Sequence, residues 1–208
     1  MPKVMDEALI PMYVDGAFVH LFSCSPFGHE EMAVGWLYEA QRIASMDDIV
    51  SVTVTPERID VTTAHGLLPA VTLDQAADRL SPVTPRPDFT GDDARTLLGR
   101  LFAAADTFGC HAVGGLRANG ELIVHEDIGR HNAMDKVAGS FLALGEKPVA
   151  LVSTGRLSLD MTVKAALLDA GVVVTRKYPG TLSLGVMGRI GLRAFSGSGD
   201  EFTISDNM

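Results

Sequence analysis

Glu121-Leu-Ile-Val-His-Glu-Asp-Ile-Gly-Arg-His-Asn-Ala-Met-Asp-Lys136 is the stretch that decides the fold class. Its apolar beginning, up to His125, predicts a strand. A helix is predicted from there to about Leu144, because one apolar stripe repeats at helical spacing through Met134, Val137, Ala138, Phe141 and Leu142. A strand that leads directly into a helix is the repeating unit of α/β proteins.

The same alternation continues on both sides of this stretch. Strands are predicted over 111–116, 149–153 and 172–176, with helices over 92–107 and from 153 to about 170. Thr90-Gly-Asp-Asp93 forms a capping-box-like start to the first of these helices. Two last strands are expected near 192–195 and 201–204. Such alternation predicts an α/β layer fold with parallel strand pairs where a helix intervenes, and an antiparallel pair across Asn119-Gly120.

The N-terminal part has a different pattern. Two strands flank Asp15-Gly16, a strong hairpin signal, and a helix is predicted over 29–43 before two more strands at 49–54 and 59–61. A short helix over 74–80 and the proline-bearing run 81–88 follow. We therefore expect a small β-rich subdomain with a linker over residues 1–90 and an α/β core over 91–208.

Composition limits the functional classes. The chain has 208 residues, a formal net charge of −9 and a pI near 5.0, which argue against broad binding to nucleic acid or to an anionic membrane. No apolar run reaches the roughly 18 residues that span a bilayer, and the N-terminus lacks a signal pattern. These features predict a cytoplasmic protein.

Only two cysteines are present, Cys24 and Cys110, and they lie far apart in the sequence. Two cysteines cannot form a disulfide framework or a four-cysteine zinc site. Each is therefore either reactive or part of the packing.

Two predicted helix entrances have the composition of an anion site. The first follows the strand that ends near His125, and the free amides and positive dipole of a helix N-terminus attract anions. The second follows the strand 149–152. Together they suggest a phosphate-bearing ligand in one crevice at the carboxyl ends of the strands, contacted by Gly129, Arg130, His131, Asn132, Ser153, Gly155, Arg156 and Ser158. In the alternative reading of the first entrance, Asp127 caps the helix, Gly129 eases a turn, and Arg130 and His131 make surface contacts.

The same segments resemble a known family over nearly the whole chain. They include Val14-Asp-Gly16, Cys24-Ser-Pro26, Phe108-Gly-Cys-His111 and above all Glu126–Lys136, the most specific of them. On these motifs the chain resembles the formate dehydrogenase accessory sulfurtransferases of the FdhD/NarQ type. The resemblance implies a cytidine-deaminase-like α/β core in three layers, and a homodimer.

The zinc chemistry of deaminases does not accompany this resemblance. A deaminase needs His-x-Glu at one helix entrance and Pro-Cys-x-x-Cys at the next. This chain has Gly129-Arg-His131 and Thr154-Gly-Arg156 in their places. We therefore expect no zinc and no other metal site.

What the resemblance implies is sulfur delivery. A cysteine desulfurase would load a persulfide, and its sulfur would pass to the molybdenum or tungsten bis-molybdopterin guanine dinucleotide before that cofactor enters the catalytic subunit of formate dehydrogenase. The family carries the persulfide on a Cys-x-x-Cys loop, and no cysteine lies between Thr63 and Asp92. Cys110, beside His111, is the possible substitute. In the alternative reading Cys110 is a small buried residue and Cys24 is structural.

Family resemblance also implies nucleotide contacts in a C-terminal loop. Backbone amides and hydroxyls there would bind a guanine or a phosphate. The alternative is a flexible turn, and family members usually carry an arginine near the place of Gly197. The predicted loop comprises Phe195, Ser196, Gly197, Ser198, Gly199 and Asp200.

Three functions follow as expectations. The first is an accessory protein for formate dehydrogenase maturation that binds the guanine dinucleotide cofactor and transfers sulfur to it. The second is a chaperone for the cofactor or for an enzyme subunit, without sulfur transfer. The third and weakest is a nucleotide hydrolase or deaminase.

Overall fold

The computed structural model describes residues 5–106 and 109–202. Contacts divide the chain into two compact units, each built from segments that are distant in sequence. Unit 1 comprises Met1–Val71, Thr107–His111 and His125–Glu146, and unit 2 comprises Thr72–Asp106, Ala112–Val124 and Lys147–Met208. The boundary expected at residue 90 lies inside unit 2, just before its first long helix.

Unit 1 contains a four-stranded sheet in the order β2-β1-β4-β3. β1 and β2 form the expected hairpin, in which Asp15 and Gly16 have φ angles of 51° and 80°. Such left-handed angles at both turn residues favour glycine and short polar side chains. The elements of unit 1 are β1 (Ala8–Val14), β2 (Ala17–Cys24), α1 (His29–Glu39), the 3₁₀ turn η1 (Met46–Asp48), β3 (Ile49–Val54), β4 (Ile59–Thr63) and α4 (Arg130–Leu144).

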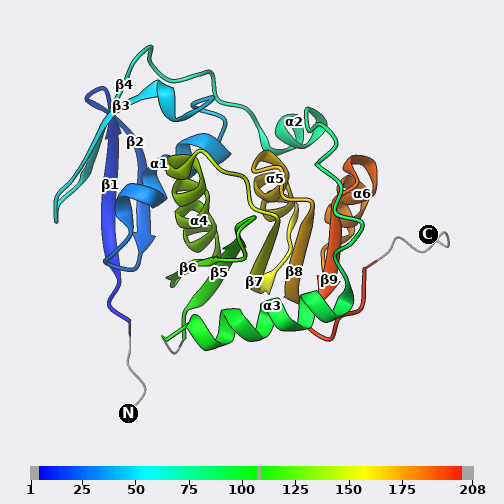
Figure 1. Cartoon of the computed structure of the whole chain (residues 1–208). Coiled ribbons are helices and arrows are strands. Elements are labelled where there is room, and N and C mark those ends of the chain that lie inside the picture. Colours follow the sequence, from blue (N-terminus) through cyan, green and yellow to red (C-terminus); the bar gives the residue numbers. More distant parts are fainter. Residues whose placement is uncertain (1–4, 107–108, 203–208) are drawn as a thin grey trace. The chain divides into compact units, whose positions relative to one another are not determined.

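Helix α1 packs on this sheet, and α4 lies beside α1 (Figure 1). Alternate residues of β1 face the helix, and a core cluster joins them to Met32, Ala33 and Leu37 of α1. The two helices cross where each has a glycine. A Cβ on Gly35 would lie 1.8 Å from the carbonyl oxygen of Asp135, and one on Gly139 would lie 2.0 Å from that of Glu31.

Unit 2 is built around a five-stranded sheet in the order β6-β5-β7-β8-β9, of which β5 and β6 have terminal residues in unit 1. β5 pairs antiparallel with β7, whereas β7, β8 and β9 are parallel, as expected where a helix intervenes. The elements are α2 (Leu73–Asp78), α3 (Gly91–Ala104), β5 (His111–Leu116), β6 (Leu122–Asp127), β7 (Ala150–Arg156), α5 (Leu159–Leu167), β8 (Val172–Lys177), α6 (Thr181–Ile190) and β9 (Arg193–Ser196). The α/β class is thereby confirmed.

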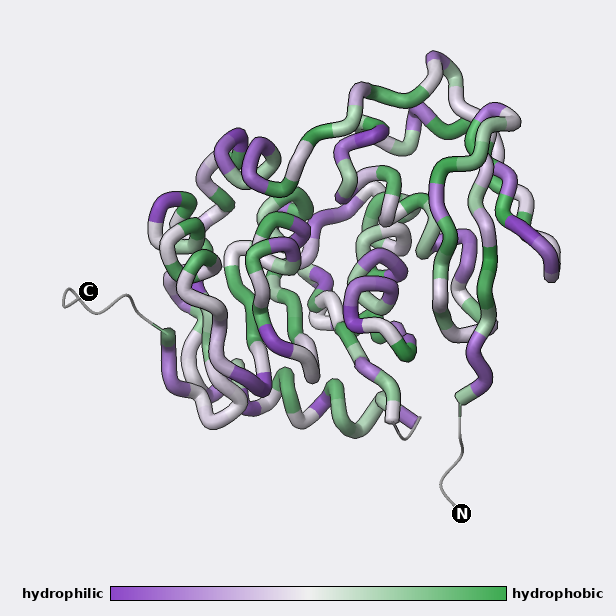
Figure 2. Tube along the Cα trace, turned by 180° about the vertical axis from the view of Figure 1, so that it is seen from behind, coloured by the Kyte–Doolittle hydropathy of each residue, from purple (hydrophilic) through white to green (hydrophobic). Residues whose placement is uncertain are grey.

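Helix α3 covers one face of the unit 2 sheet. Thr90 caps it as expected, with a reciprocal bond to Asp93. Its apolar stripe packs on alternate residues of the strands, among them Val152 and Val174. Figure 2 shows the result: the central strands are apolar, and α3 alternates between apolar and polar positions.

One prediction for the C-terminal part differs from the structure. Helix α6 was not expected; Gly180 is the residue that precedes the helix. Of the strand expected over 201–204, Glu201 forms an isolated bridge with Phe195, and residues 203–204 lie outside the described residues. No helix in the described part of the chain is long and apolar enough to cross a membrane.

Candidate functional site

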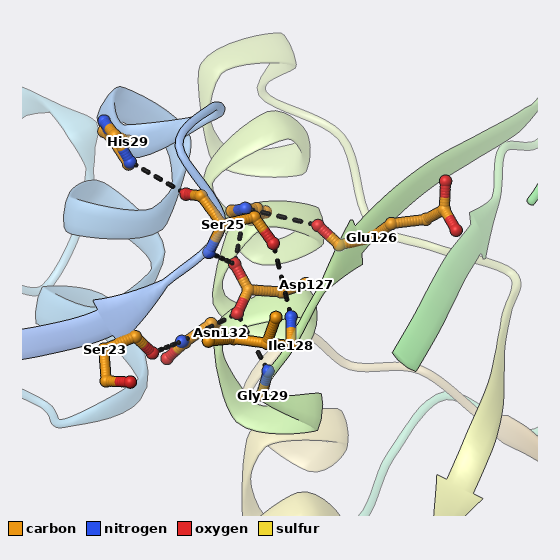
Figure 3. Close-up of polar contacts among 9 residues, drawn as sticks. Ser23, Ser25, His29, Glu126, Asp127, Ile128, Gly129 and Asn132 are labelled. Atoms are coloured by element: carbon orange, nitrogen blue, oxygen red, sulfur yellow. Dashed lines mark hydrogen bonds and ion pairs between the residues drawn. The ribbon is translucent and has the colours of Figure 1, made fainter. Parts of the chain in front are cut away.

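The first predicted entrance, where β6 leads into α4, surrounds the carboxylate of Asp127. This side chain is fully buried and accepts four hydrogen bonds (Figure 3). Its Oδ2 atom accepts from the amide of Ser25 at 3.0 Å and from Nζ of Lys136 at 2.7 Å. Its Oδ1 atom accepts from the amide of Gly129 and from Nδ2 of Asn132, both at 2.9 Å. Such complete pairing lets a charge persist without water.

Lys136, the partner of this carboxylate, is also fully buried. Its Nζ atom donates a second bond to the carbonyl oxygen of Glu126 at 3.2 Å and lies 4.6 Å from the ring centroid of Phe27. The alkyl stem of Lys136 passes within 3.2 Å of the position that a Cβ on Gly28 would take. Lys136 therefore holds the loop before α1 against α4.

Ser25 and Asn132 extend the same network to β2. Ser25 accepts from the amide of Ile128 through its Oγ at 3.2 Å, and its carbonyl oxygen lies 2.9 Å from Nε2 of His29. Asn132 donates its second amide proton to the carbonyl oxygen of Ser23 at 2.7 Å (Figure 3). Both amide protons of Asn132 are thus engaged within the protein, which corrects its expected role as a donor to a ligand.

The alternative reading that Asp127 caps α4 is also wrong. The N-cap residue of the helix is Gly129, and the described part of the chain shows no side-chain cap bond at this position. The first turn contains no acidic residue. The N-terminus of this fifteen-residue helix therefore keeps its positive partial charge.

Arg130, the first residue of α4, is the unsatisfied group at this entrance. Its side chain is half-buried, and its Nε atom is buried without a hydrogen-bond partner among the described residues. His131 is half-buried beside it and has a partner within the chain. An unpaired guanidinium at a helix N-terminus has the charge and the donors to hold an anionic group.

The second predicted entrance, in unit 2, differs from its prediction because β7 continues to Arg156. Ser153 and Gly155 are buried within this strand and bond inside the fold: Gly155 donates to Oγ of Ser153 at 3.0 Å and accepts from Oγ1 of Thr175 at 2.6 Å. Ser158 is the N-cap residue before α5 and donates its hydroxyl to Asp160. Of the predicted contacts here, Arg156 alone presents an exposed charged side chain, paired in register with Lys177 of β8.

The predicted C-terminal loop is fastened to α3. Arg95 donates to the carbonyl oxygen of Ser198 at 2.6 Å, and a Cβ on Gly197 would lie 2.3 Å from a methyl group of Leu98. Phe195 is 3% exposed and belongs to the core cluster of unit 2. Its side chain therefore has a packing role, and a ligand contact at Phe195 stays a prediction.

The last residue of this loop, Asp200, carries a negative charge. Asp200 accepts from the hydroxyl of Ser198 at 2.6 Å, and its amide donates to Oγ of Ser196 at 3.0 Å. The Ser198 hydroxyl bond is the main reason that the pKa of Asp200 lies below its usual value. The loop thus offers an ionised carboxylate next to Gly199, which opposes a phosphate rather than attracting one.

The two thiols are in environments that disfavour the thiolate. Burial and, to a lesser extent, the nearby carboxylate of Asp127 raise the pKa of Cys24 to about 11. Burial also raises the pKa of Cys110, which is half-buried, and the charges of Glu126 and Asp127 act in the same direction. The expected activation of Cys110 by His111 is opposed by these effects.

The predicted site residues therefore fall into two groups. Gly129, Arg130, His131 and Asn132 belong to unit 1 with Cys110 and His111, whereas Ser153 to Ser158 and Phe195 to Asp200 belong to unit 2. Whether both entrances serve one crevice stays a prediction. Sequence reasoning missed the ion pair of Asp127 and Lys136; both residues stood in the most specific motif, but nine residues apart.

Together these features define an α/β protein with an arginine at a helix entrance and another at the end of a strand, neither paired with the residues that the structure describes. A model of the FdhD/NarQ family matches residues 70–195, which is more than half of the chain. The chain belongs to the FdhD/NarQ family.

Two named relatives and one solved structure extend this finding. The chain is 28% identical over 207 residues to the sulfur carrier protein FdhD of Methanothermobacter thermautotrophicus, covering 91% of this chain and 83% of that protein. It is 33% identical over 129 residues to the same-named protein of Cupriavidus necator, covering 59% of this chain and 45% of that one. A crystal structure from Desulfotalea psychrophila, provisionally assigned as a formate dehydrogenase accessory protein, superposes with a TM-score of 0.81 at 25% identity over 97% of this chain and 89% of that one.

Proposed function

We propose that this chain is an accessory protein in formate dehydrogenase maturation that binds the molybdenum or tungsten bis-molybdopterin guanine dinucleotide as cargo. The name of its relatives, sulfur carrier protein FdhD, and the assignment of the similar crystal structure support the pathway. The observation that carries the binding step is the unpaired guanidinium of Arg130 at the N-terminus of α4. A pyrophosphate group of the cargo could accept hydrogen bonds both from the guanidinium of Arg130 and from the free amides at the N-terminus of α4.

The chemistry of Arg130 suits a phosphate. Its buried Nε has lost water and gained no partner among the described residues, which costs about 1–3 kcal/mol until an acceptor arrives. The uncapped amides of the first turn point out of the N-terminus of α4, where the positive end of the helix dipole also attracts an anion. Because Gly129 has no side chain, the backbone can approach the ligand closely.

Arg156 is a second, independent candidate contact in unit 2. It is exposed at the carboxyl end of β7 and lies in register with Lys177. Ligands of open α/β sheets bind at such strand ends. Each arginine is proposed as a separate phosphate contact, to be tested by its own variant.

Sulfur transfer is the less supported half of the function. A desulfurase persulfide would have to pass its outer sulfur to a thiolate of this chain, and the raised pKa values of Cys24 and Cys110 keep both thiols largely protonated at neutral pH. This favours the second function, a cofactor chaperone without a persulfide of its own. A cysteine desulfurase, a formate dehydrogenase catalytic subunit and a second copy of the chain remain proposed partners.

Complementation separates these functions. In a bacterium that lacks its own FdhD-family protein, the native chain should restore formate dehydrogenase activity, and Arg130→Ala should not. If the double variant Cys24→Ser/Cys110→Ser restores activity as well as the native chain, sulfur is not carried on this chain and the chaperone function holds. If it restores none while folding normally, a thiol is required. Failure of the native chain would contradict the proposal.

A further inference from the structure

Unit 2 contains a cavity of about 390 Å³ that none of the predicted site residues lines. Its size is at the lower end of the range for small-ligand sites. The proline-bearing segment before α3 forms one wall and the outer side of α3 another. The residues that matter for recognition are Arg86, Asp88, Phe89, Leu97, Leu116 and Val149.

This cavity lies at the opposite edge of the sheet from Arg156. Val149 directly precedes β7, and Leu116 ends β5, which is antiparallel to β7, so both residues mark the amino end of β7. Arg156 is at the carboxyl end of the same strand. Seven residues of extended chain separate the two edges by roughly 20 Å. A ligand in the cavity is therefore independent of the proposed phosphate contact at Arg156.

Arg193 fixes the wall of the cavity. It donates from Nη1 to the carbonyl oxygens of Arg86 at 2.8 Å and of Phe89 at 3.0 Å. Its own guanidinium is paired with Glu201 and lies 4.8 Å from the ring centroid of Phe195. The segment therefore keeps its shape without a ligand, and binding would not have to order it.

The charged side chains that line the cavity differ in whether they have hydrogen-bond partners within the protein. Asp93 uses Oδ2 to accept from the amide and the hydroxyl of Thr90, and Arg100 donates to the carbonyl oxygen of Gly120 at 2.8 Å. In contrast, the guanidinium of Arg86 makes no hydrogen bond or ion pair with the described residues, and its Nε atom is buried. The stem of Arg86 is held close to Gly171, where an added Cβ would lie 2.7 Å from its Cγ.

We propose that this cavity binds a small organic carboxylate with an apolar, preferably aromatic, body. The carboxylate would accept from the guanidinium of Arg86, which has no acceptor among the described residues. The apolar body would rest on Leu97, Leu116 and Val149 with the ring of Phe89 beside it. The exposed Asp88 at the same cavity disfavours ligands with more than one negative charge.

The probe for this proposal is 3-phenylpropionate, followed by the backbone amide shifts of the ¹⁵N-labelled chain. Titration should give saturable shifts centred on Leu97, Leu116 and Val149. Two analogues should each bind at least fivefold more weakly: 3-phenylpropanamide, which lacks the charge, and acetate, which lacks the aromatic group. Equal binding of the amide would overturn the role of Arg86, and shifts that do not saturate or lie elsewhere would overturn the site.

Two variants and one control complete the test. Arg86→Met keeps the stem beside Gly171 but removes the charge, and should weaken binding at least fivefold. Thr96→Trp on α3 fills the cavity from its exposed side and should abolish the shifts, which keeps the test valid if Arg86→Met misfolds. Arg79→Met, at an exposed arginine beyond α2, should bind like the native chain. Unchanged affinity in both cavity variants would contradict the proposal.

Discussion

The Nζ atom of Lys136 lies 2.7 Å from Oδ2 of Asp127, and neither side chain is exposed to solvent. This pair joins the last residue of β6 to the second turn of α4 and, through the amide of Ser25, to the residue that follows β2. The motif that identifies the family therefore has two kinds of residue. Asp127, Asn132 and Lys136 build the entrance, and Arg130, whose Nε has no partner among the described residues, is the proposed ligand contact.

The first prediction concerns this ion pair. Lys136→Met should lower the free energy of unfolding by about 3–5 kcal/mol, because it leaves the buried carboxylate of Asp127 without its cation. Urea denaturation followed by circular dichroism measures the change. The matched control is Lys147→Met, whose exposed bridge to Asp169 should contribute less than about 1 kcal/mol. Equal losses in the two variants would contradict the account.

The second prediction concerns the crossing of α1 and α4. Gly35→Ala and Gly139→Ala should each destabilise the chain by about 1–3 kcal/mol or more, because the added Cβ would overlap the backbone of the other helix. Gly99→Ala in α3 is the control, since nothing lies within 4 Å of its added Cβ. That substitution should stabilise the chain by about 0.5–1 kcal/mol. The same denaturation experiment measures all three, and stabilisation by Gly35→Ala would disprove the close crossing.

The third prediction concerns the thiols. A raised pKa lowers the thiolate fraction at a given pH, so the native chain should react slowly with iodoacetamide at pH 7.5. The rate at Cys24 should rise about tenfold per pH unit until the pH approaches its pKa of about 11. Cys110, which is less buried, should react faster than Cys24. Mass spectrometry of timed samples measures both, with urea-unfolded protein as the fast control. Rapid labelling of native Cys110 at pH 7.5 would restore the case for sulfur transfer.

The fourth prediction concerns pH. Burial lowers the pKa of His125, whose Nε2 lies 2.8 Å from Oγ of Ser140. The unfolded chain takes up this proton below about pH 6.5, whereas the folded chain resists it, so stability should fall as the pH drops from 6.5 toward the folded pKa. His125→Gln does not titrate and should show a flatter stability profile between pH 7 and 5. Identical profiles would exclude His125 as the source.

Local patterns predicted most of the elements but not their long-range partners. The hairpin at Asp15-Gly16 and the cap at Thr90 depend on residues within a few positions, and both are as expected. The pair of Asp127 and Lys136 depends on Ser25, which is 102 residues away from Asp127. Only side chains three or four residues apart on a helix are expected to pair, so a spacing of nine residues does not suggest an ion pair. From the sequence, Asp127 is therefore interpreted as a helix cap.

Long-range partners that local sequence patterns do not show also explain the errors at the candidate site. Ser153 and Gly155 look like a loop that precedes a helix, yet pairing with β8 extends the strand to Arg156. The serines of the C-terminal loop look free in the sequence, but Asp200 and Arg95 engage them. Helix α6 escaped detection because Gly185 and Gly188 interrupt its apolar pattern.

Calorimetric titration with GDP tests the central claim most directly, because this nucleotide carries the guanine and pyrophosphate of the proposed cargo. The native chain should bind GDP, and Arg130→Ala should weaken binding by roughly 10- to 150-fold, the value of one charged hydrogen bond of about 1.5–3 kcal/mol. Arg79→Ala, at an exposed arginine of unit 2, should leave the affinity unchanged. No binding by the native chain, or equal binding by Arg130→Ala, would contradict a phosphate contact at the entrance of α4.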